Sequence, residues 1–256
     1  MFDSGVGGLS VLRAVRRALP HAALTYVADS AFAPYGERTE AEILQRSLRI
    51  VDHLRDRGAT LVVVACNTAT AVAIETLRRR YPDSTFVGVE PGIRPAVAAS
   101  RCGRIAVLAT QATLRSERFA ALVRREGGPC QVHVQACPGL AAAIERGRFD
   151  DPELHTLLRR YTEPVLASGA DAVVLGCTHY AFVRGDIQDL LGPGVTVIDT
   201  ADAVAAQVAR CWAPAVGVPT PPSCRLETTG DPASLRDFAH AWLDIDTAAS
   251  SRPLDL

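Results

Sequence analysis

Short, mainly apolar runs rich in β-forming residues alternate with longer amphipathic segments along almost the whole chain. A run that is apolar at every position indicates a strand buried on both faces, as in a parallel sheet. The runs that predict strands are residues 24–28, 61–66, 85–89, 105–109, 132–136, 172–175 and 195–198. The segments that predict helices are residues 9–19, 40–57, 69–81, 114–126 and 153–167. This order predicts βαβ units and an α/β fold.

Local signals support two of the helix starts. Thr39 and Glu42 have the spacing of a capping box before the second helix. Asp151 followed by Pro152 is typical of a helix start, because the aspartate can cap and a proline fits the first turn. Pro164 lies inside the helix that follows, where a proline is expected to kink or divide it.

The ends of the chain have weaker patterns. Little apolar sequence precedes the glycine-rich turn at residues 5–8, so any first strand is expected to be very short. Residues 214–222 are rich in proline and predict a surface loop before a terminal strand and helix. Residues 246–256 predict a loose tail.

The chain also repeats a pattern. Residues 62–68 and 173–179 each form an apolar run that leads into a cysteine and then into small polar residues at the opening of a helix. This repeat predicts two similar lobes with mostly parallel sheets flanked by helices, and a cleft between them. The expected limits are 1–93 with 206–256 for the first lobe, and 94–205 for the second.

Composition narrows the class of protein. The chain has 256 residues, of which 48% are hydrophobic and 21% charged, and its formal net charge is -1. These values are typical of a globular protein and give no electrostatic reason to expect a nucleic-acid or membrane partner. No apolar run reaches the roughly 18 residues of a membrane span. The start lacks the pattern of a secretory signal, so a cytoplasmic location is predicted.

Seven cysteines need an explanation. Their odd number and the missing signal argue against a disulfide framework. There is no C-x-x-C pair, and the close pair Cys130 and Cys137 has a single histidine nearby, His133, which leaves fewer than the four ligands of a structural zinc site, so no metal site is predicted. Most of the seven are expected to be small buried apolar side chains. Cys66 and Cys177 differ because they end the repeated strands.

The two repeated cysteines are candidates for acid/base chemistry. Ligands of open α/β sheets bind beyond the carboxyl ends of strands, where both thiols are expected. The opening of a helix favours a thiolate through its N–H groups and dipole. Two thiols across a cleft suit a reaction that removes a proton from one face of a carbon and returns one to the other. Simple packing at the strand ends is the alternative interpretation.

Other polar residues follow the predicted strands. Asp3 begins a glycine-rich turn in which Ser10 replaces the third glycine of a dinucleotide fingerprint, so it is a candidate cleft carboxylate or a helix cap. Thr110 and Thr113 offer hydroxyls to a polar substrate. For Thr113, a simple helix cap is the alternative interpretation. His179 could lower the pKa of the thiol two positions earlier, or act as a cap.

A combination of motifs resembles glutamate racemase, a member of the aspartate/glutamate racemase superfamily. The motifs are Phe2 to Gly8, Pro34-Tyr35-Gly36, Ala65 to Ala69 and Leu175 to Tyr180, in the family's order and spacing from residue 2 to about residue 212. The resemblance implies two lobes with the substrate between them, and catalysis without pyridoxal phosphate or metal. It also implies interconversion of L- and D-glutamate that supplies D-glutamate for peptidoglycan, and it is compatible with a homodimer.

The same resemblance implies roles for individual residues. Cys66 would deprotonate D-glutamate with the help of Asp3. Cys177 would deprotonate L-glutamate with the help of His179 and Glu145, although Glu145 by itself has the pattern of a solvated carboxylate on a short helix. The substrate contacts implied are Asp3, Ser4, Tyr35, Gly36, Asn67, Thr68, Thr110, Thr113, Thr178 and His179.

The chain departs from the family pattern at three points. Only Met1 precedes Phe2, where the family has several residues, so the first strand is either very short or truncated. Ala181 replaces a proline that usually follows the His-Tyr pair. The arginine that some members have before Pro-Tyr-Gly is missing from residues 31–33.

Alternative functions remain open from the sequence. The nearest is an aspartate or hydantoin racemase of the same superfamily. A second class is a Cys-His acyl-transfer enzyme built on Cys177 and His179, although their spacing is not expected to aim the imidazole at that thiol. A third is a catalytically silent module that binds an amino acid in the cleft.

Overall fold

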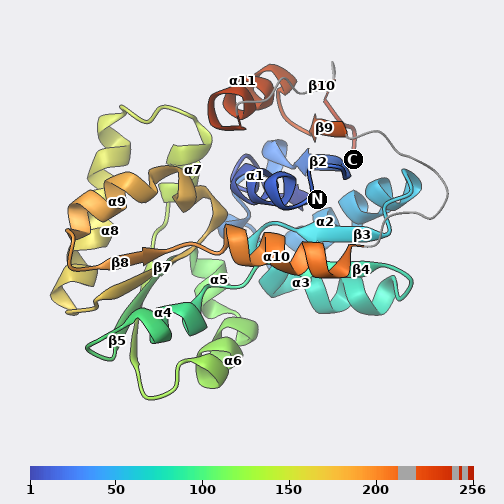
Figure 1. The fold of residues 1–256 in the computed structure, drawn as a ribbon. Helices are drawn as coiled ribbons and strands as arrows, with labels where there is room; N and C mark the ends of the chain where they lie inside the picture. Colours follow the sequence, from blue (N-terminus) through green and yellow to red (C-terminus); the bar gives the residue numbers. More distant parts are fainter. Residues whose placement is uncertain (213–222, 244–247, 250–252) are drawn as a thin grey trace.

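The computed structural model describes residues 1–212, 223–243, 248–249 and 253–256, and its strands form two parallel sheets (Figure 1). The six-stranded sheet has the order β10-β9-β2-β1-β3-β4, and the four-stranded sheet the order β6-β5-β7-β8. The predicted α/β fold with two lobes is therefore confirmed; the first lobe is built on the larger sheet and the second on the smaller one. The strands are β1 (Phe2–Asp3), β2 (Ala23–Ala28), β3 (Leu61–Val64), β4 (Thr85–Gly88), β5 (Arg104–Ala109), β6 (Gln131–Ala136), β7 (Ala172–Gly176), β8 (Thr196–Ile198), β9 (Ser223–Thr228) and β10 (Ala248–Ala249).

Helices flank both sheets. The α-helices are α1 (Leu9–Ala18), α2 (Glu40–Asp56), α3 (Asn67–Arg80), α4 (Ile93–Ala99), α5 (Gln111–Arg115), α6 (Glu117–Glu126), α7 (Leu140–Glu145), α8 (Pro152–Ala167), α9 (Arg184–Leu191), α10 (Ala201–Cys211) and α11 (Pro232–Leu243). Short 3₁₀ turns are η1 (Ser30–Phe32), η2 (Tyr35–Glu37) and η3 (Thr178–Val183). Within the described residues, no helix combines the length and the apolar character that crossing a membrane requires.

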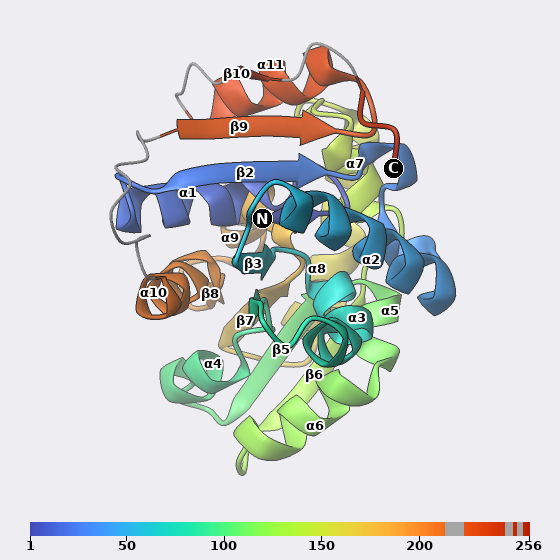
Figure 2. The same ribbon diagram turned by 90° about the vertical axis from the view of Figure 1, so that its right-hand side faces the viewer.

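The limits proposed for the lobes, 1–93 with 206–256 and 94–205, stay a prediction. The boundary between residues 205 and 206 falls inside α10, a helix that packs against α1 and β4 of the first lobe. Figure 2 shows β9 beside β2, with α11 on the outer side of β9. The chain therefore returns to the first lobe through α10 and completes its sheet with β9 and β10.

The local helix signals have mixed outcomes. The capping box is confirmed, because the Thr39 hydroxyl accepts from the Glu42 N–H and the Glu42 carboxylate accepts from the Thr39 N–H. The Asp151 side chain caps α8, as predicted. Of the two expectations for Pro164, division of the helix is wrong, since α8 continues past it to Ala167, and a kink stays a prediction. The single helix predicted over 114–126 is also wrong: it is broken at Ser116, whose hydroxyl caps α6.

The two ends of the chain join the larger sheet. The first strand is very short, as predicted, and Phe2 pairs with Val27 of β2 and with Val64 of β3. The predicted loop at 214–222 lies outside the described residues, whereas the terminal strand and helix are confirmed as β9 and α11. The predicted loose tail is wrong where it is described. β10 pairs with β9, and the Leu254 N–H donates to the Thr228 carbonyl at 2.6 Å.

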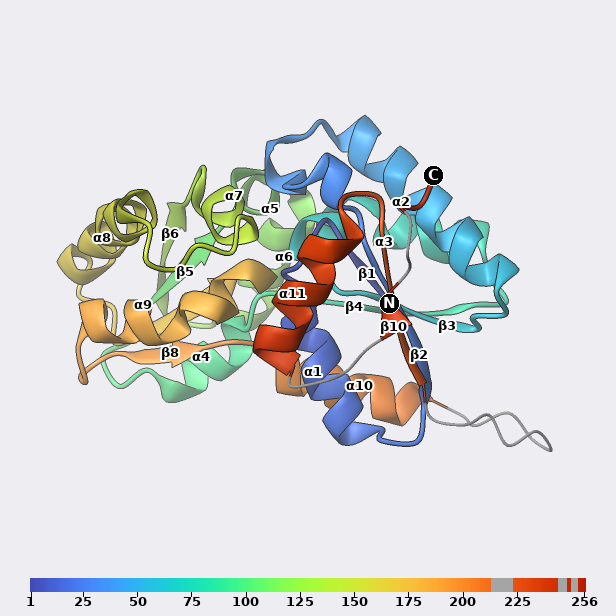
Figure 3. The same ribbon diagram turned by 90° about the horizontal axis from the view of Figure 1, so that it is seen from above.

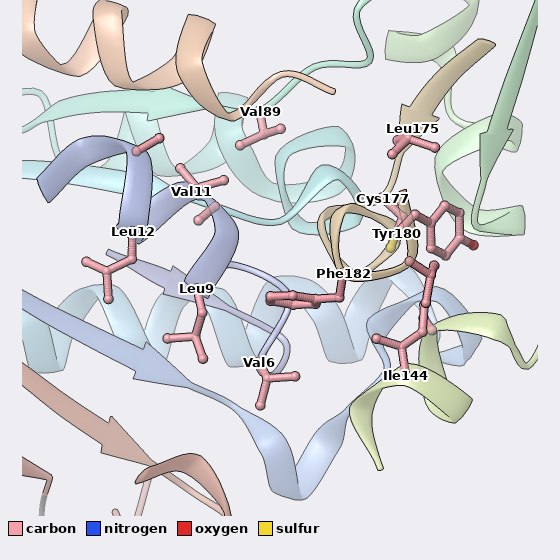
Figure 4. Packing of buried hydrophobic residues seen from close by; sticks show 14 of the residues in the cluster. Val6, Leu9, Val11, Leu12, Val89, Ile144, Leu175, Cys177, Tyr180 and Phe182 are labelled. Atoms are coloured by element: carbon pink, nitrogen blue, oxygen red, sulfur yellow. The ribbon is translucent and has the colours of Figure 1, made fainter. Parts of the chain in front are cut away.

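The largest apolar core is shared by the two lobes (Figure 4). It includes Leu9 and Leu12 of α1 together with Leu175 of β7 and Tyr180 and Phe182 of η3. Each of these side chains is buried, and full burial of a large apolar side chain contributes about 1.5–3 kcal/mol. This core fixes η3, the turn that follows Cys177, against the first lobe.

Candidate active site

Both repeated cysteines lie at the carboxyl ends of parallel strands. Cys66 follows β3 and is the N-cap residue of α3, and Cys177 follows β7 and precedes η3. They line one small, narrow pocket of about 10 Å³ to which both lobes contribute. The residues that line it are Ser4, Pro34, Tyr35, Gly36, Cys66, Asn67, Thr68, Thr110, Ala141, Cys177, Thr178 and His179.

Three of the predicted site residues do not line this pocket but contact residues that do. Asp3 accepts from the Thr178 hydroxyl, and Thr113 shares a hydrogen bond with Thr68. Glu145 pairs with His179. These three side chains therefore reach the pocket through a neighbour.

The Cys66 thiol lies among groups that hold it in its neutral form. Its sulfur accepts from the Ala69 N–H at 3.5 Å and lies 4.0 Å from the Ser4 hydroxyl oxygen. Burial and the nearby Asp3 carboxylate raise the pKa of the thiol well above its ordinary value, and the Ala69 N–H only partly opposes them. The N–H at the helix opening does favour the thiolate, as expected, but desolvation by burial outweighs this single donor.

Asp3 connects the two lobes beneath the pocket. Its side chain is fully buried, and its oxygens accept from the Ser4 N–H at 2.7 Å and from the Thr178 hydroxyl at 3.0 Å. Burial raises the pKa of Asp3, although His179 and hydrogen bonds from its neighbours oppose the shift. A carboxylate whose pKa is raised is a better acceptor for a thiol proton.

Cys177, His179 and Glu145 form a line of hydrogen-bonded groups. The Cys177 sulfur lies 3.8 Å from Nδ1 of His179, and Nε2 of the same ring lies 2.6 Å from the Glu145 carboxylate. The imidazole does therefore lie beside the thiol, contrary to the expectation from their spacing. Burial alone would lower the pKa of His179, but Cys177 and Glu145 raise it well above its ordinary value.

Glu145 is held by donors from both lobes. Besides His179, it accepts from the Val6 N–H at 2.9 Å and from the Ser30 hydroxyl at 3.1 Å. Burial would raise the pKa of Glu145, but these hydrogen bonds outweigh it and lower that pKa. The alternative of a solvated surface carboxylate is wrong. The result is a carboxylate–imidazole pair that can keep a proton beside Cys177.

Three threonine hydroxyls meet where the lobes face each other. The Thr68 oxygen lies 3.0 Å from that of Thr110 and 3.2 Å from that of Thr113, and the last two are 3.0 Å apart. Thr110 also caps α5 by accepting from the Thr113 N–H. Each hydroxyl has one proton and two lone pairs, so this cluster retains acceptor sites.

The remaining predicted contacts come from η2 and α3. Tyr35 lines the pocket, but its hydroxyl donates to Asp29 at 2.5 Å and is not directed to a ligand. A Cβ on Gly36 would lie 2.7 Å from that of Thr110, so only glycine fits there. The Asn67 amide donates weakly to the Val89 carbonyl, at 3.5 Å.

The sequence interpretation missed Ser30, Asp29 and Ala141. Asp29 and Ser30 follow the predicted strand at 24–28, which was a usable signal because polar residues after a buried strand reach the ligand edge of a sheet. Ala141 gives no such signal. Among the residues that the structure describes, no group of three or more His, Cys, Asp or Glu side chains is arranged to hold a metal ion.

This geometry defines a class of protein: two α/β lobes that each bring one thiol to a shared pocket. Residues 9–208 match the model of the family described as Asp/Glu/Hydantoin racemase. The chain belongs to that family.

Its relatives include several glutamate racemases. The glutamate racemase of Herpetosiphon aurantiacus is 49% identical over 236 residues, which cover 91% of this chain and 92% of that protein. The crystal structure of a glutamate racemase isoform from Bacillus anthracis has a TM-score of 0.88 at 30% identity, covering 100% of this chain and 96% of the other. The Escherichia coli glutamate racemase, solved with L-glutamate and the activator UDP-MurNAc-ala, has a TM-score of 0.84 at 30% identity, covering 97% and 96%.

Proposed function

We propose that this protein interconverts L- and D-glutamate by a two-thiol mechanism that needs no cofactor. The observation that carries the proposal is that Cys66 and Cys177, from different lobes, line one pocket. The glutamate racemases among its relatives support glutamate as the substrate. A carbon atom between two such groups can lose its proton to one and gain a proton from the other.

In the direction from D- to L-glutamate, the Cys66 thiolate removes the α-proton and Cys177 donates its thiol proton to the opposite face. In the reverse direction the two thiols exchange roles. Proton transfer by positioned groups of this kind is general acid–base catalysis, which depends on matched pKa values. Because the Cys66 thiol is held neutral in the free site, it must lose its proton when substrate binds.

Neighbouring groups can make that ionisation possible. The substrate's ammonium group would favour the thiolate, since an opposite charge nearby stabilises the charged form. Asp3 would accept the thiol proton of Cys66, while His179 and Glu145 would serve Cys177. The residues that would contact the substrate are Ser4, Tyr35, Gly36, Asn67, Thr68, Thr110, Thr113 and Thr178, with Asp3 and His179.

The wider role follows from this activity. D-glutamate is a building block of peptidoglycan, and we infer that this enzyme supplies it in the cytoplasm. We also propose that the enzyme forms a homodimer and that its lobes have the limits given above. Size-exclusion chromatography with light scattering measures the oligomeric state directly.

Solvent-deuterium incorporation at the α-carbon tests the mechanism. The two enantiomers have equal free energy, so kcat/KM must be the same in both directions and cannot separate the two thiols. Deuterium incorporation into each enantiomer can separate the roles of the two thiols. We expect Cys177→Ser to lose racemisation by several orders of magnitude but to exchange the α-proton of D-glutamate, and Cys66→Ser to exchange only that of L-glutamate. Two variants that racemise like the parent would exclude the two-thiol mechanism.

Relative rates with glutamate, aspartate and hydantoins test the choice of substrate. The family description includes all three classes, so the comparison separates the alternatives within the family. We expect glutamate to be the preferred substrate by a wide margin. A higher rate with aspartate or a hydantoin would overturn that assignment while leaving the racemase mechanism intact.

A further inference from the structure

A buried ion pair lies directly behind the pocket wall. Asp29, at the carboxyl end of β2, is fully buried, and the side chain of Arg46 on α2 is only 6% exposed. Nε of Arg46 donates to one carboxylate oxygen at 2.9 Å and Nη2 donates to the other at 2.7 Å. Such a two-pronged contact fixes the relative orientation of both groups, because the guanidinium and the carboxylate are planar.

The Asp29 carboxylate also holds the loop at residues 34–36, which lines the pocket. It accepts from the Tyr35 hydroxyl at 2.5 Å and from the Thr229 hydroxyl at 2.8 Å. Tyr35 lines the pocket together with its neighbours Pro34 and Gly36. Asp29 therefore connects the substrate side of this loop to the interior of the first lobe.

Arg46 itself has no donor directed at the pocket. Its Nη1 donates to the Leu256 carbonyl at 2.6 Å, and its guanidinium lies over the Phe32 ring, 3.9 Å from the centroid. Neither Asp29 nor Arg46 lines the pocket. The pair can thus influence a ligand only through Tyr35 and the loop that it belongs to.

We propose that Asp29 and Arg46 are positioning residues that hold the loop at residues 34–36 in its binding-competent place, and so set the affinity for substrate. The inference rests on the proposed glutamate racemase function. It assigns the Tyr35 hydroxyl a role in holding the loop and leaves the ring and the adjacent backbone to contact the substrate. Pre-ordering a binding loop improves affinity because the ordering cost is met before the ligand arrives.

Variants of the pair and of the tyrosine test this proposal by steady-state kinetics. Tyr35→Phe removes only the hydroxyl, and Arg46→Lys keeps the charge but loses the two-pronged geometry. We expect each to raise KM for both glutamate enantiomers by about tenfold, the effect of one charge-assisted hydrogen bond, with kcat changed by less than about threefold.

His53→Gln is the matched control. His53 lies on the same helix as Arg46 and pairs with the buried Glu227 of β9 at 2.7 Å, away from the pocket. This variant also breaks a buried pair and should lower the melting temperature, but KM should stay within about twofold of the parent. If Tyr35→Phe and Arg46→Lys change KM no more than His53→Gln does, the positioning role is wrong.

Amide hydrogen exchange gives a second measurement that does not need activity. We expect faster exchange over residues 30–37 in Arg46→Lys and in Tyr35→Phe, but not in His53→Gln. Unchanged exchange there would overturn the positioning role even if the enzyme racemises glutamate. If the two variants exchange faster but the parent protein does not racemise glutamate, the proposed function alone is overturned.

Discussion

Glu145 belongs to the second lobe, but two of the groups that hold its carboxylate, the Val6 N–H and the Ser30 hydroxyl, belong to the first. Its third partner is His179, which contacts Cys177. Partners from both lobes mean that the carboxylate reaches full stabilisation only when the lobes are together. This residue therefore couples the arrangement of the lobes to the charge beside the second thiol.

The Glu145–His179 pair predicts a pH window for stability. The pKa of Glu145 is lowered on folding, so its contribution is present above about pH 4.5 and is lost as the pH falls through the folded pKa. The pKa of His179 is raised, so its contribution is complete below about pH 6.5 and is lost as the pH rises through the folded pKa. The melting temperatures of the parent and of Glu145→Gln should therefore differ most between about pH 4.5 and 6.5.

A surface carboxylate provides the control for this window. Glu153 pairs with Arg146 at 2.7 Å, but both side chains are largely exposed, so Glu153→Gln should change the melting temperature little at any pH. A difference between the parent and Glu145→Gln that stays constant from pH 4 to pH 9 would contradict the assigned charge states.

At the scale of elements, the turn between β1 and α1 closely approaches two side chains of the other lobe that we propose to be catalytic, Glu145 and His179. A Cβ on Gly5 would collide with the Glu145 carboxylate, and one on Gly7 would collide with the His179 ring. The surroundings of these two positions give a reason for glycine, which is the close approach of the two side chains.

We expect Gly5→Ala and Gly7→Ala to lower kcat/KM by about a hundredfold, because a displacement of about 1 Å in a catalytic group can cost that much. Gly185→Ala on α9 is the control, since a Cβ there meets nothing within 4 Å. Racemisation rates and melting temperatures of the three variants test whether the two turn positions require glycine. Near-parental activity in both turn variants would mean that Glu145 and His179 can move aside freely.

The parts of the fold that the sequence predicts are those with a local cause. The strands that lead to the two cysteines contain no polar side chain, so these strands and the thiols at their ends could be placed. The break at Ser116 escaped prediction because its cap lies inside an otherwise continuous amphipathic run. The contacts of Glu145 and the use of the Tyr35 hydroxyl depend on residues far apart in the chain, which a single sequence does not reveal.

At the scale of the whole molecule, aromatic side chains of α11 join the first lobe to the turn that follows Cys177. Figure 3 shows α11 crossing above α1, which it contacts. Its Phe238 and Trp242 pack against Phe182 of η3, with ring centroids 4.9 and 4.8 Å apart, respectively. Edge-on and tilted pairs at such distances add to the gain from burial. The C-terminal helix thereby supports the backbone that positions His179.

Phe238→Ala should consequently weaken both stability and catalysis. Removing a buried phenylalanine ring costs about 3–5 kcal/mol, which in a protein of this size lowers the melting temperature by roughly 2–4 °C per kcal/mol. The freed space beside Phe182 should let η3 shift, so kcat should fall as well, and Phe238→Leu should give intermediate values of both quantities. Leu166→Ala on α8 removes a side chain that is 47% exposed and should change neither. If calorimetry finds a large loss of stability in Phe238→Ala while kcat stays parental, α11 stabilises the fold but does not position the catalytic turn.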